Sequence, residues 1–291
     1  MNGLVVVDKP KGITSHDVVS RVRQLLGESS IGHLGTLDPM ATGVLPLLLG
    51  KYTRLLQFFG KLPKSYTGTI CFGYSTDTYD ADGAPTSASC HPVLTLEQVR
   101  AASSGFHGEV EQTPPVFSAK KIDGKPAYKM AREGKAVVMK AVRINIDQFD
   151  LLSLEGNVAE FSIRVSAGGY VRSVAHDLGE ILGCGAHLAS LRRTAAGPFA
   201  IDEALSLAQI EALSGVGELE QHMRHPRELL PTLPSVTADS FSAGRLRNGG
   251  AVNLPEFSGA PLVKVFADQH DLLAISKRVA GTLFQPVVVL G

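Results

Sequence analysis

One stretch of the sequence, residues 32–43, combines an isolated carboxylate with a backbone that is free to form an unusual loop. It contains three glycines and one proline in twelve residues, which argues against a helix or a central strand. Its acidic residue, Asp38, precedes Pro39 and is therefore biased toward an extended conformation. Small neighbours would let a substrate approach, so that Asp38 could act as a nucleophile or a base. The local pattern alone favours an Asx-turn, in which the carboxylate binds only its own backbone.

Four further stretches accompany this loop. In chain order they are residues 8–12 (DKPKG), 64–68 (KSYTG), 114–120 (PPVFSAK) and 169–173 (GYVRS). Together with the Asp38 loop they resemble, in the same order, the motifs of the TruB-type tRNA pseudouridine synthases. The resemblance covers about the first two hundred residues well, weakens to about residue 233 and returns faintly at the C-terminus. Five motifs in the same order are unlikely to arise by chance. The catalytic interpretation of Asp38 is therefore preferred over the Asx-turn.

The resemblance implies a specific reaction. Enzymes of this family isomerise uridine 55 in the T-loop of tRNA to pseudouridine, which breaks the bond from N1 to C1′ and joins C5 to C1′. By resemblance Asp38 is the catalytic carboxylate, Tyr66 stacks on the target base and helps to remove the C5 proton, and Arg172 keeps Asp38 ionised. No redox or external group-transfer step occurs, so no metal, nucleotide or flavin is required and we expect no cofactor.

The resemblance also implies a set of substrate-binding residues. His33 would occupy the space that the flipped nucleotide leaves, although a lone loop histidine is more often a structural hydrogen-bonding residue. Tyr170 and Leu191 would form the wall of the pocket. Lys9 and Lys120 belong to two of the motifs and are candidates for substrate contact. The turn at Lys9 is expected to support the active site from beneath before it takes part in chemistry.

Arg172 has an argument of its own. It falls in the first turn of a helix expected over residues 170–182 and off the apolar stripe of that helix. A basic side chain there opposes the helix dipole, so a partner carboxylate or phosphate explains it better than helix stability does. The pairing of Arg172 with Asp38 is therefore the testable core of the predicted site.

Hydrophobic periodicity predicts the elements that must position these residues. Strands are expected over residues 4–7, 44–49, 64–72, 142–154 and 158–165, with Pro46 at a bulge or an edge. Helices are expected over residues 15–26, 53–59, 95–103, 126–134 and 170–182, and within 202–230. Ser15 is the expected cap of the first helix, and a turn at Asp123 and Gly124 is expected before the fourth.

The bulk composition bounds the class of protein. With 291 residues and a formal net charge of zero, the chain is long enough for one large domain and a small one. No apolar run approaches the roughly 20 residues of a membrane span. The apolar run at residues 4–7 is too short for a signal peptide, so we expect a cytoplasmic protein without membrane contact.

The sequence predicts no metal site. Cys71, Cys90 and Cys184 are far apart, which suggests neither a disulfide framework nor a zinc site. Residues 78–83 have part of the spacing of a calcium loop. Thr78 at the first position and Ser89 at the twelfth exclude that interpretation.

Charge is unevenly distributed along the chain. Residues 118–143 hold eight basic residues and only two acidic ones, Asp123 and Glu133. The basic residues are Lys120, Lys121, Lys125, Lys129, Arg132, Lys135, Lys140 and Arg143. Residues 200–239 reverse the balance, with seven acids against Arg224 and Arg227. One face could therefore hold phosphates, although charge alone fits an ordinary solvated helix and turn as well.

We predict an α+β protein of two domains. Its core, by resemblance, is the pseudouridine synthase fold: a mixed, mostly antiparallel sheet flanked by helices. The break at residues 231–234 predicts a catalytic domain over 1–233 and a small β-rich, PUA-like RNA-binding domain over 234–291. The C-terminal part has strand candidates at 262–266, 272–275 and 287–290. Residues 246–249 (LRNG) look like the opening of a PUA-type module, but a generic small β-cap is nearly as good.

The predicted partner is the T-arm of tRNA, with no obligate protein partner. Two alternatives stay open. The chain could be an RNA-binding or tRNA-folding module whose active site is vestigial, as the basic stretch and the PUA-like tail would allow. It could also be a guide-RNA-dependent enzyme acting on ribosomal RNA, although the compact C-terminus and the lack of long basic tails count against this.

Overall fold

The computed structural model describes residues 1–291 except Ala119, Asp123 and Ala136, and gives only the backbone of Lys121, Pro126 and Arg132. Ala119 of the 114–120 motif and the turn predicted at Asp123 therefore lie outside the described residues. Within the described residues the chain forms one large sheet, one smaller sheet near the C-terminus and a short hairpin.

The large sheet carries the elements that frame the Asp38 loop. Its strands are β1 (Gly3–Lys9), β2 (Ile31–His33), β3 (Thr42–Leu49), β4 (Lys64–Phe72), β5 (Gly108–Gln112), β8 (Val142–Glu155), β9 (Val158–Val165), β10 (Ala186–Ala196) and β11 (Phe199–Ala200). They are ordered β1-β3-β10-β4-β9-β8-β5, with β2 paired to β3 and β11 paired to β10. Among these described strands only β3 and β10 pair in parallel. The predicted mixed, mostly antiparallel sheet is confirmed.

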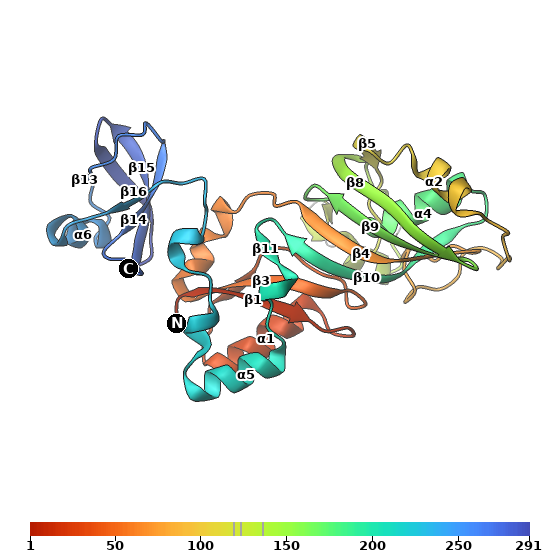
Figure 1. The fold of residues 1–291 in the computed structure, drawn as a ribbon, viewed down its shortest axis with the longest axis horizontal. Helices are drawn as coiled ribbons and strands as arrows, with labels where there is room; N and C mark the ends of the chain where they lie inside the picture. Colours follow the sequence, from red (N-terminus) through yellow and green to blue (C-terminus); the bar gives the residue numbers. More distant parts are fainter. Residues whose placement is uncertain (119, 123, 136) are drawn as a thin grey trace.

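Helices cover the two halves of this sheet separately (Figure 1). α1 (Ser15–Leu26) and α5 (Leu207–Val216) lie side by side against β1 and β3, where Val18 and Val22 of α1 pack with strand side chains such as Val5. α2 (Leu96–Ser103) and α4 (Val171–Ile181) pack on the half that contains β4, β8 and β9. The alternation of β4 supplies this second core, because Ile70 and Phe72 are fully buried in it.

The C-terminal residues form a second sheet at one end of the molecule (Figure 1). Its strands are β12 (Ser235–Thr237), β13 (Val252–Asn253), β14 (Leu262–Phe266), β15 (Leu272–Ala280) and β16 (Leu283–Val289), in the order β12-β14-β15-β16-β13, and α6 (Ser240–Arg247) packs on it. This sheet shares a hydrophobic cluster with the large one, since Phe266 and Leu290 pack in the same cluster as Val44 and Phe59. The two sheets are therefore joined by a common core as well as by the chain.

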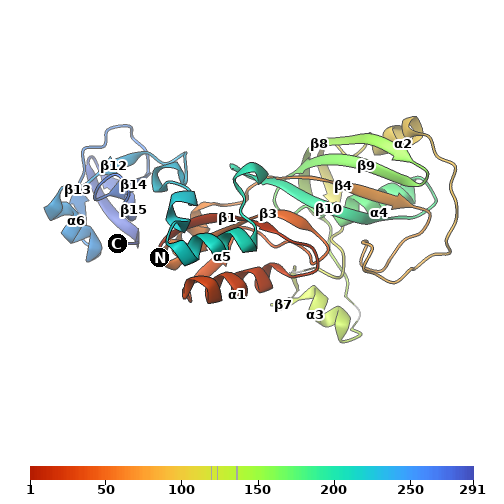
Figure 2. The ribbon, with the colours of Figure 1, turned by 60° about the horizontal axis from the view of Figure 1, so that its bottom comes forward.

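The basic stretch leaves the main body. Its elements are the strands β6 (Lys121–Ile122) and β7 (Lys125–Pro126) and the helix α3 (Ala127–Arg132). In Figure 2 α3 stands apart from both sheets. Lys120 donates a hydrogen bond to the carbonyl of Lys140, at 3.2 Å, so the two ends of this stretch are tied together.

Three local predictions differ from the structure. Thr14, not Ser15, caps α1, and its side chain accepts a hydrogen bond from the N–H of Asp17 in a capping box. Pro46 lies at neither an edge nor a bulge, because β3 pairs with β1 in unbroken register. On its other side Pro46 falls between the residues that pair with β2 and those that pair with β10, where a missing N–H costs no ladder hydrogen bond.

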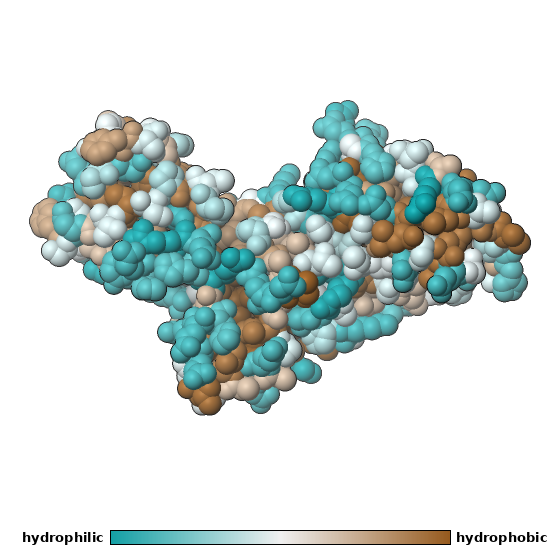
Figure 3. Space-filling model, viewed as in Figure 1, coloured by the Kyte–Doolittle hydropathy of each residue, from teal (hydrophilic) through white to brown (hydrophobic). Residues whose placement is uncertain are grey.

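The third difference concerns residues 202–230, which are only partly helical. They contain α5 and short 3₁₀ segments at Ile201–Glu203, Leu219–His222 and Pro226–Glu228. The segment predicted over residues 53–59 is likewise a 3₁₀ helix, Gly50–Phe58. Figure 3 shows that hydrophilic residues cover much of the visible face, with hydrophobic ones at the end farthest from the C-terminal sheet and around α1 and α5. Among the described helices none is long and apolar enough to cross a membrane.

Candidate active site

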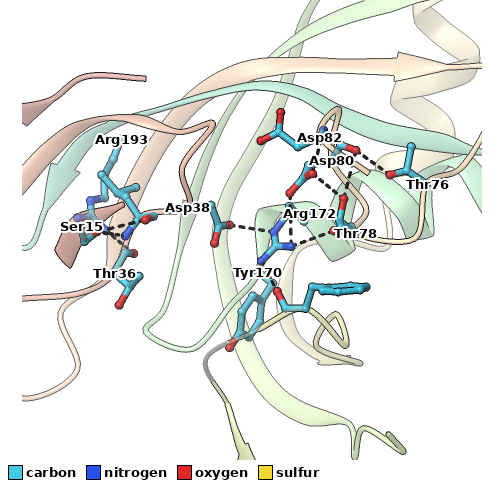
Figure 4. Close-up of polar contacts among 12 residues, drawn as sticks. Ser15, Thr36, Asp38, Thr76, Thr78, Asp80, Asp82, Tyr170, Arg172 and Arg193 are labelled. Carbon is cyan, nitrogen blue, oxygen red and sulfur yellow. Dashed lines mark hydrogen bonds and ion pairs between the residues drawn. The ribbon is translucent and has the colours of Figure 1, made fainter. Parts of the chain in front are cut away.

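The loop that carries Asp38 is held from two sides by buried side chains (Figure 4). The hydroxyl of Ser15 accepts a hydrogen bond from the N–H of Leu37, at 2.8 Å, and donates one to the carbonyl of Leu37, at 3.1 Å. The guanidinium of Arg193, which is fully buried, donates to the carbonyls of Gly35, Thr36 and Val44 at 3.0, 3.3 and 2.6 Å. These bonds fix the backbone on both sides of Asp38, so the loop presents its carboxylate in one position.

The carboxylate of Asp38 faces the guanidinium of Arg172, as predicted (Figure 4). Nε of Arg172 lies 2.9 Å from Oδ2 of Asp38 in an ion pair, with 5% of the arginine side chain and 37% of the aspartate side chain exposed. The Nε–H is not aligned for a hydrogen bond, so attraction between the charges defines the contact. No backbone N–H among the described residues donates to the Asp38 carboxylate, so the Asx-turn alternative does not describe this loop.

Arg172 is held in place by three further acceptors. Its terminal nitrogens donate to the carbonyl of Thr78, at 2.9 Å, and to the carbonyl of Phe117, at 3.0 Å. Nη1 also lies 3.4 Å from Oδ2 of Asp80, a carboxylate that is itself buried. A buried guanidinium with this many fixed partners is oriented before any substrate arrives.

Asp80 is a site residue that the sequence analysis did not identify. Its carboxylate accepts from the hydroxyl of Thr78, at 2.6 Å, and from the N–H of Asp82, at 3.2 Å. Burial raises the pKa of Asp80, while the Thr78 hydroxyl and the Arg172 guanidinium oppose that rise. Residues 78–83 have only the incomplete spacing of a calcium loop, and no local pattern links Asp80 to a helix about ninety residues later.

A cavity of about 270 Å³ opens beside the ion pair. It is lined by Gly35, Thr36, Leu37, Asp38, Lys64, Tyr66, Gly168, Gly169, Tyr170, Val171, Arg172, Leu191 and Arg193. The predicted residues Asp38, Tyr66, Arg172, Tyr170 and Leu191 are thus brought together on its wall, from four separate parts of the chain. Burial raises the pKa of the Tyr66 hydroxyl against the opposing effect of the Arg193 guanidinium, so this phenol is neutral near pH 7.

Three predicted substrate contacts lie elsewhere. Lys9 is fully buried beneath the loop, and its ammonium donates to the carbonyls of Pro10, Ile13 and Pro39 at 2.9, 2.6 and 3.3 Å. Lys9 does not line the cavity. It lies beneath the loop, in the supporting position expected for the turn. Burial lowers the pKa of Lys9 to about 8.

His33 and Lys120 also lie outside the lining of the cavity. Nδ1 of His33 accepts from the N–H of Gly35, at 3.3 Å, and burial lowers the pKa of the imidazole. His33 therefore lies at the start of the Asp38 loop with a neutral side chain. Lys120 belongs to the basic stretch, where it binds the Lys140 carbonyl.

Arg193 and Lys64 line the cavity but were given no role by the sequence analysis. The alternation of side chains along a strand could have identified Arg193 as a cavity residue. In β10, Arg193 shares a face with Leu191, while Arg192 points to the other face. Arg192 instead forms a surface ion pair with Asp8, at 2.8 Å. The described residues hold no group of three or more His, Cys, Asp or Glu side chains that could bind a metal.

Comparison with known proteins shows which family models and relatives the chain matches. Residues 23–171 match the model of the TruB family pseudouridylate synthase N-terminal domain, and residues 172–231 match that of the tRNA pseudouridylate synthase B C-terminal domain. The sequence is 45% identical to tRNA pseudouridine synthase B of Solibacter usitatus over 100% of both chains. It is 42% identical to tRNA pseudouridine synthase B of Aquifex aeolicus, over 97% of this chain and 98% of the relative.

The fold has a solved counterpart. The crystal structure of a Cbf5-Nop10-Gar1 complex contains a chain that aligns with a TM-score of 0.72 at 26% identity, covering 99% of this chain and 85% of that one. Fold and site together define an enzyme of the pseudouridylate synthase class. Within that class, the chain belongs to the TruB family.

Proposed function

We propose that this protein converts uridine 55 in the T-loop of tRNA to pseudouridine, with Asp38 as its catalytic carboxylate. The names of its relatives give the substrate class, tRNA, and the reaction. The observation that carries the proposal for the site is the pairing of Asp38 with the buried Arg172 at the wall of a cavity. Arg172 places a positive charge 2.9 Å from the Asp38 carboxylate, the group that would act as nucleophile or base.

The cavity suits one extruded nucleotide. Its volume of about 270 Å³ is near the lower end of the range for ligand pockets, about 300 Å³. A uridine must leave its stack to bring C1′ and C6 near Asp38, so we propose base flipping. Asp38 then attacks C1′, attacks C6, or removes the 2′ proton. We propose that His33, at the start of the loop and outside the lining of the cavity, fills the space that the nucleotide vacates.

Tyr66, Tyr170 and Leu191 would hold the uracil while it turns. The raised pKa of Tyr66 keeps its ring in the phenol form, which supports stacking on the base and makes a phenolate base for the C5 proton less favourable. Leu191 is 8% exposed and gives an apolar contact opposite the polar ion pair. Lys9 would act indirectly, by supporting Pro39 from beneath.

The remaining RNA contacts are proposed for two places. The basic stretch begins next to the site, because the carbonyl of Phe117 binds Arg172, and it continues through Lys120 to α3. It would track phosphates of the T-arm. We also propose that residues 1–233 form the catalytic domain and that residues 234–291 form a PUA-like RNA-binding domain, supported by the separate sheet and the exposed Phe241 of α6. An enzyme acting on tRNA without a protein partner is expected in the cytoplasm.

Incubation of the purified protein with a uridine-containing T-loop hairpin, followed by chemical mapping of pseudouridine, tests the proposal. Wild-type protein should modify one uridine without any added guide RNA. Asp38→Asn should form no pseudouridine yet still bind the hairpin, because the change removes the charge and keeps the shape. Asp147→Asn is the matched control, since Asp147 is an exposed carboxylate in a surface ion pair with Arg164.

Each alternative has its own outcome in this experiment. Wild-type protein that binds the hairpin but leaves every uridine unchanged would favour an RNA-binding module with a vestigial site. Modification that appears only after a guide RNA is added would favour the guide-dependent enzyme. Pseudouridine formed by Asp38→Asn would remove the central role of Asp38.

A further inference from the structure

One short segment supplies two of the partners of Arg172. Thr78 gives its carbonyl to Nη1, and Asp80 gives its carboxylate to the same nitrogen. Tyr79 lies between them with a positive φ of 64°, a conformation that residues other than glycine, asparagine and aspartate rarely adopt. The two contacts that orient Arg172 therefore depend on a backbone position that needs support from outside the segment.

The side chain of Tyr79 has such a support. Its ring stacks on the imidazole of His176, with centroids 3.8 Å apart and planes inclined by 5°. Both residues are half-buried. His176 follows Arg172 by one helical turn of α4, so the two side chains lie on the same side of that helix. A single helix thus holds the segment twice, by the guanidinium at Thr78 and Asp80 and by the imidazole at Tyr79.

No polar contact among the described residues explains the placement of His176. Its Nδ1 atom is buried and has no hydrogen-bond partner in the part of the chain that the structure describes. A buried ring nitrogen without a partner is unfavourable, so the position of the imidazole is set by packing, chiefly by the stack on Tyr79. The stack of His176 on Tyr79 is therefore the contact to be explained.

The backbone on the other side of Tyr79 is already fixed. The carbonyl of Tyr79 accepts from the N–H of Leu188, and the N–H of Ala81 donates to the carbonyl of Leu188, both at 3.0 Å. These bonds tie the segment to β10. Toward α4 the segment is held by side chains, namely Arg172 at Thr78 and Asp80 and the stack of Tyr79 on His176.

We propose, resting on the function proposed above, that Tyr79 and His176 are positioning residues of the isomerase. Their stacked rings hold Thr78 and Asp80 against Arg172, and Arg172 in turn aims the carboxylate of Asp38. Neither ring lines the cavity, so the pair acts through Arg172 and does not touch the nucleotide.

The proposal predicts a change in kcat without a change in KM. His176→Ala and Tyr79→Asn each remove one ring, and asparagine tolerates the positive φ of position 79. Each should lower kcat for the T-loop hairpin about tenfold while KM stays within about twofold, because a small displacement of a catalytic group is costly to the chemical step alone. His176→Phe and Tyr79→Phe keep a flat ring for the stack and should restore kcat to within about twofold of wild type.

The double variant Tyr79→Asn with His176→Ala completes the test. It should be no slower than the slower single variant, because both changes break one contact. Multiplied losses in the double variant would overturn the proposal, and so would full kcat in either single variant, or a rise in KM in place of a fall in kcat. Failure of the phenylalanine variants to restore kcat would also overturn it.

Failure of the proposed function has a separate signature. It appears as wild-type protein without isomerase activity, before any variant is compared. Thermal unfolding of the same four proteins, wild type, Tyr79→Asn, His176→Ala and the double variant, then still measures the ring contact. Non-additive shifts in Tm support the stack as a coupling of α4 to the segment, and additive shifts overturn it.

Discussion

Asp38 and Asp80 lie on opposite sides of one cation, the guanidinium of Arg172. Nε lies 2.9 Å from the Asp38 carboxylate, which is open to the cavity, and Nη1 lies 3.4 Å from the Asp80 carboxylate, which is buried. The pKa of Asp80 is raised, chiefly by burial. The two carboxylates therefore contact the same guanidinium in different surroundings, Asp80 from within the protein and Asp38 from the wall of the cavity.

The raised pKa of Asp80 predicts a dependence of stability on pH. A carboxyl whose pKa lies above its ordinary value of 3.8 in the folded protein binds its proton more tightly there than in the unfolded chain. Its contribution to stability is therefore greatest at low pH and is lost as the pH rises above 3.8. The asparagine of Asp80→Asn does not titrate. The free energy of unfolding of this variant should therefore increase relative to that of wild type as the pH rises.

Urea unfolding of both proteins at several pH values between about 4 and 7 measures this difference in unfolding free energy. Asp147→Asn serves as the control at an exposed carboxylate, 44% exposed in its pair with Arg164. A difference between Asp80→Asn and wild type that stays constant over this range would show that Asp80 has no raised pKa.

Removing the shared cation should be more harmful than removing either acid. Arg172→Met leaves the buried Asp80 carboxylate and the carbonyls of Thr78 and Phe117 without their donor. A broken buried ion pair costs about 3–5 kcal/mol of unfolding free energy, and kcat should be lost with it. Arg172→Lys keeps the charge but not the planar fork, so we expect an intermediate loss.

The matched control is Arg192→Met. Arg192 is 42% exposed and pairs with Asp8 on the surface, where such a pair contributes about 0–1 kcal/mol. Urea unfolding and pseudouridine assays on the three variants give the comparison. Equal losses for Arg172→Met and Arg192→Met would contradict the argument from burial.

Sequence patterns predicted the local elements and one long-range pair. Periodicity predicted β4, β8 and β9 and the helix over residues 95–103 that forms α2, and the misplaced charge of Arg172 pointed to the partner that it has. These succeeded because each rests on a period or on a dipole that acts over a few residues.

What the sequence did not predict depends on which residues meet after folding. Ser15 was expected to cap a helix, but Thr14 does so, and the Ser15 hydroxyl binds Leu37 of the Asp38 loop. Arg193 has no role in the sequence analysis, and only its place in β10 brings its guanidinium to the carbonyls of Gly35 and Thr36. Such contacts between distant segments leave no local pattern to read.

Lys9 should connect the stability of the loop to its activity. Lys9→Met leaves three buried carbonyls without a donor, so the free energy of unfolding should fall by about 1–3 kcal/mol and kcat should fall because Pro39 loses its support. The folded protein releases the Lys9 proton at a pH of about 8, before the unfolded chain does at 10.5. Wild type should therefore gain stability relative to the variant as the pH rises between these values.

Lys264→Met is the control for Lys9→Met. It shows what the loss of a buried ammonium does when that group does not support the Asp38 loop. Lys264 is also buried and donates to two carbonyls, at 2.6 and 2.7 Å, but it lies in β14 of the C-terminal sheet. It should lower stability and leave kcat unchanged. The role of Lys9 as a support of the catalytic loop would be refuted by a Lys9→Met enzyme with the kcat of wild type.

The C-terminal sheet should not be removable without cost to the large one. The cluster that it shares with the large sheet includes Phe266, Ile275, Leu290, Leu4 and Phe59. Each such side chain that becomes exposed loses about 1.5–3 kcal/mol of hydrophobic stabilisation. Residues 1–233 alone should therefore have a lower Tm and a tendency to aggregate, which thermal unfolding and size-exclusion chromatography measure.

Arg54→Ala in the intact chain is the comparison for that truncation. Arg54 is exposed, and within the described part of the chain its side chain contacts the C-terminal sheet through one hydrogen bond, to the carbonyl of Val289, so the effect of its loss should be small. A monomeric fragment with the Tm of the whole chain would show that the predicted boundary at residue 233 separates independent domains.

Gly43, where the catalytic loop enters β3, should tolerate no side chain. Its φ is +102°, and a Cβ atom there would lie 2.2 Å from the carbonyl oxygen and 2.9 Å from the nitrogen of Arg193. Relief requires β3 and β10 to separate where Arg193 holds the loop. Gly43→Ala should therefore destabilise the protein by about 3 kcal/mol or more and abolish kcat.

Gly27→Ala is the control. The φ of Gly27 is also positive, at +59°, but among the described residues no atom beyond its chain neighbours lies within 4 Å of the position of its Cβ. We expect Gly27→Ala to lose about 1 kcal/mol of unfolding free energy and to retain kcat. Thermal unfolding and hairpin modification distinguish the two, and similar losses in both would mean that backbone strain, not the contact with Arg193, governs position 43.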